Sequence, residues 1–171
     1  MKDFILKMFF CLFSMILLLH SWGFNPSWAQ MSQPPSPLTS EMISVETDKT
    51  QYATGEIIKV VVSNKSSARL RVDSYTSLRC SIQKLEKGDW QIVPLVACSC
   101  GKVMCNMPEI YLEPQQFYEF TWTQRTSWCA GSEMKTAFVK PGAYRVLCPL
   151  SASSARDDKI TVVSKEFLIG S

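Results

Sequence analysis

From residue 41 onward, apolar and polar side chains alternate in short runs that are separated by polar, Gly- or Pro-containing segments. Alternation with a period of two is the pattern of a β-strand that buries one face. No segment carries a sustained apolar stripe with a period of 3.6, so helices should be few and short. The runs predict strands at 42–47, 57–63, 70–75, 78–82, 90–96, 118–122, 144–148 and 160–169. About seven short strands with frequent turns predict an all-β, immunoglobulin-like antiparallel sandwich.

The first forty residues follow a different pattern. Lys2 and Lys7 precede an apolar run at 8–19, and Ser27-Trp28-Ala29 places small residues three and one positions before a cut ahead of Gln30. The run is about 12 residues long, whereas a membrane-spanning helix needs about 20. We therefore predict a cleaved signal peptide at 1–29, a Pro/Ser-rich spacer at 30–40 and one domain at 41–171.

Three cysteines interrupt the strand pattern between residues 96 and 117. Cys98, Cys100 and Cys105 fall within eight residues, with Met104 and Met107 beside them. This segment predicts a loop insertion that is bridged to the sandwich by disulfides.

Six cysteines remain once the signal and its Cys11 are removed: Cys80, Cys98, Cys100, Cys105, Cys129 and Cys148. An even number in an exported domain indicates a disulfide set. Because the insertion holds three cysteines, at least one bridge must join it to the remaining three. We expect Cys80 to pair with Cys148 on neighbouring central strands. A second bridge should lie within the insertion and involve Cys105, and the third should join the remaining loop cysteine to Cys129.

Two other interpretations of the cysteine segment stay open. Thiolates of Cys98, Cys100 and Cys105 could bind a soft metal such as Cu(I) or Zn²⁺, although the spacing matches no standard zinc motif. Closely spaced cysteines could also take part in thiol exchange. Disulfide bonding is the preferred interpretation, and no metal or other cofactor is expected.

Composition restricts the function. The only histidine is His20, inside the predicted signal, so the remaining chain lacks the usual general base and the Ser-His and Cys-His nucleophile systems. The 18 basic and 15 acidic residues are interspersed, without the basic block typical of nucleic-acid binding. We therefore expect a domain that is not an enzyme and does not bind nucleic acid.

Aromatic and basic residues near the cysteines are candidates for contact with a partner. Trp122 shares the alternation of Tyr118 and Phe120, which predicts a core position. Trp128 falls in a predicted loop next to Cys129 and is expected to be exposed. With Trp128, the candidate binding residues are Arg125, Lys102, Met104 and Met107. Asn64-Lys65-Ser66 is a glycosylation acceptor pattern in a predicted loop.

Turn and core motifs occur in an order seen in one bacterial group. They are Tyr52-x-x-Gly55-Glu56, Lys87-Gly88-Asp89-Trp90, Leu112-Glu113-Pro114, Trp122 and Pro141-Gly142-x-Tyr144-Arg145-Val146. In this respect residues 42–148 resemble the immunoglobulin-like modules related to the intracellular subtilisin-type proteinase inhibitor of bacilli. The resemblance implies an immunoglobulin-like fold and a proteinase-inhibitor activity. A Leu-x-Pro-Gly turn of that group reads Leu112-Glu113-Pro114-Gln115 here.

Together these patterns predict a secreted or periplasmic, non-catalytic binding or accessory domain that acts through cysteine-anchored loops at 98–108 and 125–140. The expected partner is another protein or a component of the cell envelope. Contact with a membrane is expected only through the signal during export. A proteinase inhibitor and a soft-metal site at 98–105 are the alternative functions.

Overall fold

The computed structural model describes residues 39–72, 80–96, 98–101, 108–152 and 159–170. These residues belong to one compact unit, Pro35–Ser171. The signal predicted at 1–29 and most of the predicted spacer lie outside the described residues. So do four residues singled out above, Lys102, Met104, Cys105 and Met107.

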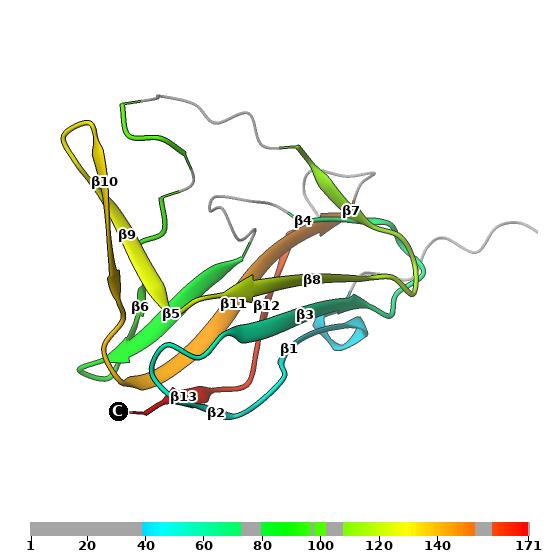
Figure 1. Cartoon of the computed structure of the whole chain (residues 1–171). Coiled ribbons are helices and arrows are strands. Elements are labelled where there is room, and N and C mark those ends of the chain that lie inside the picture. Colours follow the sequence, from blue (N-terminus) through cyan, green and yellow to red (C-terminus); the bar gives the residue numbers. More distant parts are fainter. Residues whose placement is uncertain (1–38, 73–79, 97, 102–107, 153–158, 171) are drawn as a thin grey trace, which may run out of the picture. The chain divides into compact units, whose positions relative to one another are not determined.

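One layer of the domain is a three-stranded antiparallel sheet (Figure 1). Its strands, in spatial order, are β1 (Ile43–Thr47), β3 (Ile58–Asn64) and β8 (Phe117–Trp122). In β3 the β-branched side chains of Ile58, Val60 and Val62 are buried, and they alternate with more exposed positions. This is the alternation that the sequence predicts for a strand with one face on a core.

The second layer is built around one long strand. Its members are β2 (Gln51–Tyr52), β4 (Leu70–Val72), β5 (Ser81–Glu86), β6 (Asp89–Ile92), β7 (Ile110–Leu112), β11 (Gly142–Ala152), β12 (Lys159–Val163) and β13 (Phe167–Ile169). β11 pairs with β12 and β13 along one edge, and with β4 and β5 along the other. β6 and β7 extend the sheet beyond β5 and β4, and β2 joins β13 in parallel.

The inner faces of the two layers enclose the core. The three-stranded sheet contributes Ile43, Val45, Ile58, Val60, Val62, Phe120 and Trp122, and the other layer contributes Tyr52, Leu70, Val72, Ile82, Leu112, Tyr144, Val146, Leu150, Val162, Phe167 and Ile169. The rings of Trp122 and Tyr144 pack across the two layers, with their centroids 5.7 Å apart. The predicted core position of Trp122 is confirmed.

A tyrosine and a disulfide support the immunoglobulin-like architecture. The Tyr144 hydroxyl donates a hydrogen bond to the carbonyl of Lys140, four residues upstream, as in the tyrosine corner of such sandwiches. The predicted Cys80–Cys148 disulfide is confirmed. Leu147 pairs with Ser81, so the next pair along these two strands is Cys148 and Cys80, whose Cα atoms are 4.4 Å apart. The domain is an all-β, immunoglobulin-like antiparallel sandwich.

The prediction of a loop at 125–140 is wrong. β9 (Arg125–Ala130) and β10 (Glu133–Phe138) form a two-stranded antiparallel hairpin, drawn in yellow in Figure 1. Gly131, with a φ of 66°, lies in its two-residue turn and adopts the left-handed conformation that such turns require. Trp128 therefore belongs to a strand and not to a loop.

Several smaller expectations also need correction. The described residues hold thirteen strand segments, since the run predicted at 160–169 divides into β12 and β13, and β2, β7 and the two strands of the hairpin were missed. Asn64 was expected in a loop, but it ends β3 and is buried, so its amide is not accessible to glycosylation in the folded domain. Gln115 has a φ of 64°, so the left-handed turn is kept although glycine is absent.

The predicted scarcity of helix is confirmed for the described residues, in which we find one 3-10 turn at Ser40–Met42. Within that part of the chain, no helix is sufficiently long and apolar to span a bilayer.

Candidate binding groove at the β9–β10 hairpin

A disulfide fixes the hairpin to the cysteine loop. Cys129 of β9 is bonded to Cys100, and their Cα atoms are 5.6 Å apart. This bridge confirms the predicted link between a loop cysteine and Cys129. Cys98 is also disulfide-bonded. Because Cys98 and Cys100 are both oxidised, the soft-metal alternative would first need these bonds to be reduced.

The segment that follows β6 adds hydrogen bonds along the hairpin. The Ser127 N–H donates to the carbonyl of Pro94 at 2.9 Å, and the Val96 N–H donates to the Ser127 hydroxyl at 2.6 Å. The Thr126 hydroxyl donates to the same Pro94 carbonyl. The outer edge of β9 is thus partly occupied by the chain's own backbone.

Gln124 anchors the base of the hairpin from a buried position. Its backbone has a φ of 57°, which turns the chain from β8 into β9. Its side-chain oxygen accepts a bond from the Gly55 N–H at 2.8 Å, and its Nε2 donates to the carbonyl of Ala53 at 2.9 Å. The Trp122 indole N–H donates to the carbonyl of Arg125. The hairpin base is therefore tied to the 53–55 turn and to the core.

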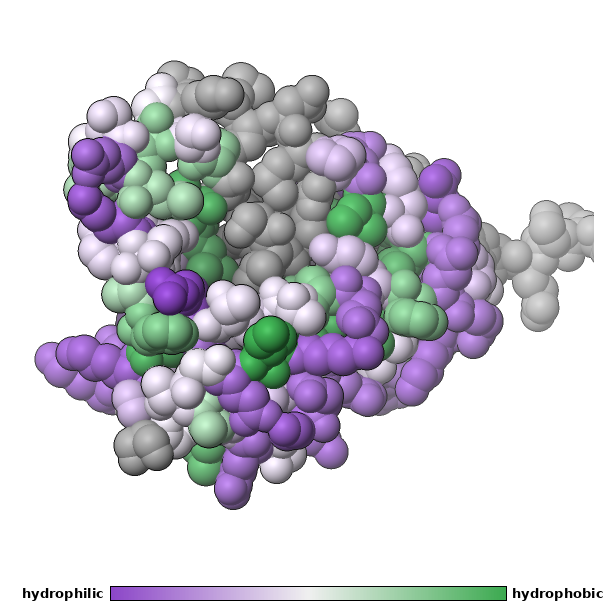
Figure 2. All heavy atoms as spheres, in the orientation of Figure 1, coloured by the Kyte–Doolittle hydropathy of each residue, from purple (hydrophilic) through white to green (hydrophobic). Residues whose placement is uncertain are grey.

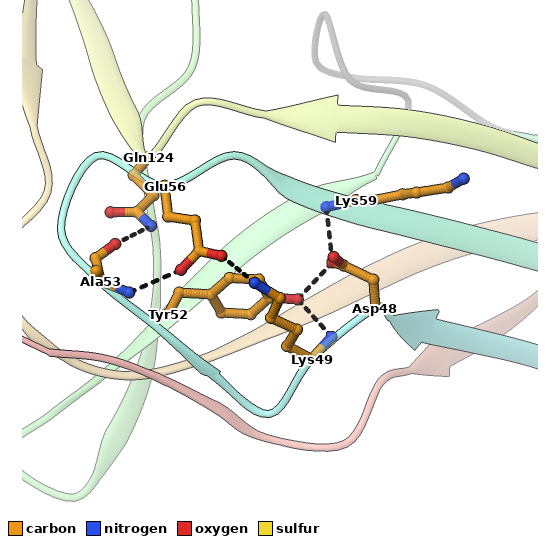
Figure 3. A network of polar contacts seen from close by, with 7 residues as sticks. All are labelled: Asp48, Lys49, Tyr52, Ala53, Glu56, Lys59 and Gln124. Carbon is orange, nitrogen blue, oxygen red and sulfur yellow. Dashed lines mark hydrogen bonds and ion pairs between the residues drawn. The ribbon is translucent and has the colours of Figure 1, made fainter.

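The same turn is held by a polar network, drawn in Figure 3. The Tyr52 hydroxyl donates to the Asp48 carboxylate at 2.7 Å and accepts a bond from the Lys49 N–H. The Lys59 N–H also donates to Asp48, and Glu56 forms an ion pair with Lys49. These contacts tie Tyr52 and Glu56 of the Tyr52-x-x-Gly55-Glu56 motif to the residues that follow β1.

The network shifts the titration of its members. Burial, and then the hydrogen bond to Asp48, raise the pKa of Tyr52 to about 12. Burial opposes ionisation of Asp48, but the hydrogen bonds from Tyr52 and from the Lys59 N–H outweigh it and lower the pKa of this carboxyl. The hydrogen bonds to Glu56 from Lys49 and from the Ala53 N–H lower the pKa of Glu56. The charged forms of both acids are thus favoured by the fold.

A groove of about 380 Å³ lies between the hairpin and the β5–β6 part of the larger sheet. The hairpin and the residues after it contribute Thr126, Trp128, Ala137, Phe138, Val139 and Lys140, and the sheet side contributes Lys84, Glu86, Gln91, Ile92, Val93, Pro94 and Tyr144. Its walls are mainly apolar, with a few polar groups at the rim, which is typical of a binding site.

Large apolar side chains around the groove remain open to solvent. The exposed fractions are 44% for Trp128, 49% for Phe138 and 61% for Ile92. The Arg125 guanidinium lies over the Phe138 ring, 4.3 Å from its centroid, and Lys84 is paired with Glu86. Figure 2 shows apolar residues interrupted by hydrophilic ones over the part of the surface that the hairpin occupies. Aromatic anchors among polar groups are a common composition for a protein-binding surface.

A larger hollow, of about 790 Å³, lies between β1 and β12. Ser, Thr, Glu and Lys side chains line much of it, and no aromatic residue is among them. We therefore place the candidate site at the smaller groove, whose lining includes the exposed Trp128 and the buried Tyr144.

The sequence predicted part of this site. The exposure of Trp128 and its position beside a bridged cysteine are confirmed, and Arg125 is found close to the groove through its contact with Phe138. Phe138, Ile92 and Gln124 were missed. Because β10 has no buried face, its sequence carries no clear alternation that would mark Phe138, and no sequence signal singles out Gln124.

Comparisons with known proteins show distant structural similarity only. No protein-family model and no curated protein matches the chain. The structural genomics target SoR45 is 11% identical, over 74% of this chain and 81% of that one, with a TM-score of 0.38. PapD-like domain 7 of human CEP192 is 14% identical, over 83% of this chain and 90% of that one, with a TM-score of 0.36. A β-glucosidase from Listeria innocua is 14% identical, over 75% of this chain but 16% of its own length, with a TM-score of 0.31.

Proposed function

We propose that this chain is an exported, non-catalytic binding or accessory domain. In this proposal the groove beside the β9–β10 hairpin holds a segment of another protein or of a cell-envelope component. The observation that carries the proposal is the exposed indole of Trp128, which lines the groove and belongs to a hairpin fixed at several points. A fixed surface loses little conformational entropy on binding, so its contacts can contribute fully to affinity.

Export is supported by two independent features. The predicted signal at 1–29 would direct the chain out of the cytoplasm. The disulfides indicate an oxidising environment, extracellular or periplasmic, in which such bonds persist. The absence of histidine after the predicted signal supports a domain without catalysis. The inhibitor activity implied by the resemblance stays a prediction, testable against extracellular subtilisin-like proteases.

The test is chemical cross-linking of the exported protein in its producing cell, followed by mass spectrometry of the cross-linked partner. Trp128→Ala removes the exposed aromatic anchor and should weaken the binding of that partner about thirtyfold or more, because central Trp contacts often contribute 2 kcal/mol or more.

The matched control is Trp90→Ala, which removes an indole on β6 outside the groove, where Arg145 stacks over it. The control should retain the partner. Equal loss in both variants, or unchanged binding by Trp128→Ala, would contradict the groove as the binding site.

A further inference from the structure

β10 offers a row of backbone groups that no described residue pairs. The Val139 N–H donates to the carbonyl of Gln124, which continues the register of the hairpin. In an antiparallel pair the hydrogen-bonded positions alternate, so the N–H and C=O groups of Met134, Thr136 and Phe138 point away from β9. Among the described residues, none forms a backbone hydrogen bond with that outer edge.

The two edges of the hairpin differ in this respect. The outer edge of β9 is partly occupied, since the Ser127 N–H bonds to Pro94 and the Arg125 carbonyl accepts the Trp122 indole N–H. β10 lies on the other side of the hairpin (Figure 1), and it contains no proline that would block strand pairing. An open edge of this kind is a template for another strand.

We propose that β10 pairs in antiparallel fashion with β10 of a second copy of this chain, so that the domain forms a two-fold symmetric dimer through a continuous four-stranded β9–β10–β10–β9 sheet. The inference does not rest on the proposed function, because the pairing depends on the outward backbone groups of β10, although the side chains of Ala137 and Phe138 also line the groove.

The side chains of β10 are self-complementary in one register. With Thr136 on the two-fold axis, Met134 of one copy lies opposite Phe138 of the other, and the two Thr136 residues lie opposite each other. Met134 and Phe138 are both about half exposed in one copy. Contacts between methionine sulfur and an aromatic ring, and Thr–Thr pairs, are favourable across antiparallel strands.

Charge also permits this pairing. Lys135 forms an ion pair with Glu133 of its own strand, so the edge presents no unbalanced charge to a second copy. The edge of β8 that faces away from β3 provides a contrast. The Asn64 N–H donates to the carbonyl of Gln116, so in the β3–β8 register the backbone groups of Phe117, Glu119 and Thr121 point away from β3. If two copies paired symmetrically along this edge of β8 about Glu119, the two Glu119 carboxylates would lie opposite each other. Like charges in that position are destabilising.

The test is the oligomeric state of the oxidised protein by sedimentation over a range of concentrations. One strand pair buries little area, so we expect a dimer that dissociates on dilution, at roughly micromolar concentrations or above. Thr136→Pro removes the central outward N–H and should reduce the mass to that of a monomer. The proline is compatible with the hairpin itself, because this N–H does not bond to β9.

Thr136→Ala is the matched control. It loses the same hydroxyl, which accepts a bond from Arg125 in the wild type, but it keeps the backbone N–H and should remain dimeric. A wild-type protein that stays monomeric up to about millimolar concentration, or a Thr136→Pro variant as dimeric as the wild type, would overturn the proposal.

A second measurement decides the question if Thr136→Pro disturbs the hairpin. In the proposed register the two Thr136 Cα atoms are about 5.5 Å apart, within disulfide range, so Thr136→Cys should form a covalent dimer on oxidation. Met134→Cys should not, because its symmetry mate lies about four residues further along the strand. Cross-linking of both variants, or of neither, would refute the pairing.

Discussion

Asn64 joins three segments of the chain through one buried amide. Its Nδ2 donates to the carbonyls of Ala68, Leu112 and Glu113, at 2.8, 3.1 and 3.1 Å. Its Oδ1 accepts bonds from the backbone N–H and the hydroxyl of Ser66. Both ends of the amide are thus satisfied, and the turn after β3 is fixed to the end of β7.

Replacing this amide should be costly. Asn64→Ala leaves buried carbonyls and an N–H without partners, so we expect the free energy of unfolding to fall by about 3 kcal/mol. Asn64→Asp should be at least as destabilising, because a carboxylate cannot donate to the three carbonyls. Urea unfolding of the purified variants measures both effects. Ser66→Ala removes only the hydroxyl that donates to Asn64 Oδ1, so it should lower the free energy of unfolding by about 1 kcal/mol. Equal losses for Asn64→Ala and Ser66→Ala would contradict the central role of Asn64.

At the residue scale, the sequence predicted which side chains pack in the core, but it missed the side chains that form hydrogen bonds between distant segments. Trp122 and Cys148 could be placed because alternation puts them on an inner face. The roles of Asn64 and Gln124 could not, since each depends on carbonyls or N–H groups many residues away. Gln115 shows the same limit: its left-handed backbone is supported by hydrogen bonds to Asn64 and Lys65, which the local sequence does not reveal.

At the scale of elements, the hairpin was missed for a physical reason. Alternation of apolar and polar residues is seen in the sequence when one face of a strand is buried and the other is exposed to solvent. Almost all residues of β9 and β10 are exposed or only partly buried, so polar and apolar side chains do not sort by face. The strands of the sandwich lie on a common core, and most of them were therefore predicted within a few residues.

The Cys80–Cys148 and Cys100–Cys129 disulfides should differ in their response to a reductant. Cys80 and Cys148 are 1% and 0% exposed, whereas Cys129 is exposed and Cys100 is partly so. Thiol–disulfide exchange needs access to a sulfur atom. We therefore expect a mild reductant to open Cys100–Cys129 in the folded protein and to leave Cys80–Cys148 intact until the domain unfolds.

Differential alkylation followed by peptide mapping measures this order. The wild type is labelled at intervals in buffer and again in denaturant, where both bridges should react. Labelling of Cys80 in the native protein as early as Cys129 would contradict the protection that we infer from burial. A protein reduced only at Cys100–Cys129 should keep the sandwich and lose the fixed position of the hairpin.

At the scale of the whole molecule, one layer is joined to the other mainly through apolar contacts, and polar networks close the ends. The 48–59 network connects β1, β2 and β3, and Gln124 connects it to the hairpin (Figure 3). The stability of the fold should consequently depend on the charge state of Asp48 and Tyr52 at this end.

The direction of that pH dependence follows from the shifted groups. The pKa of Asp48 is lower in the folded domain than its ordinary value of 3.8, so its contribution to stability is present above that value and is lost as the pH falls below it. For Tyr52 the pKa is raised from 10.0 to about 12, so its contribution is present below pH 10 and is lost as the pH rises toward 12. The free energy of unfolding, measured with urea across pH, should therefore show a plateau between these limits and a decline on each side.

Two variants test this assignment. Asp48→Asn should flatten the acid decline of the free energy of unfolding, and Tyr52→Phe should reduce the alkaline decline. The two substitutions act on one hydrogen bond, so each variant should also lower the plateau. A plateau unchanged in both variants would mean that the Tyr52–Asp48 bond does not stabilise the turn.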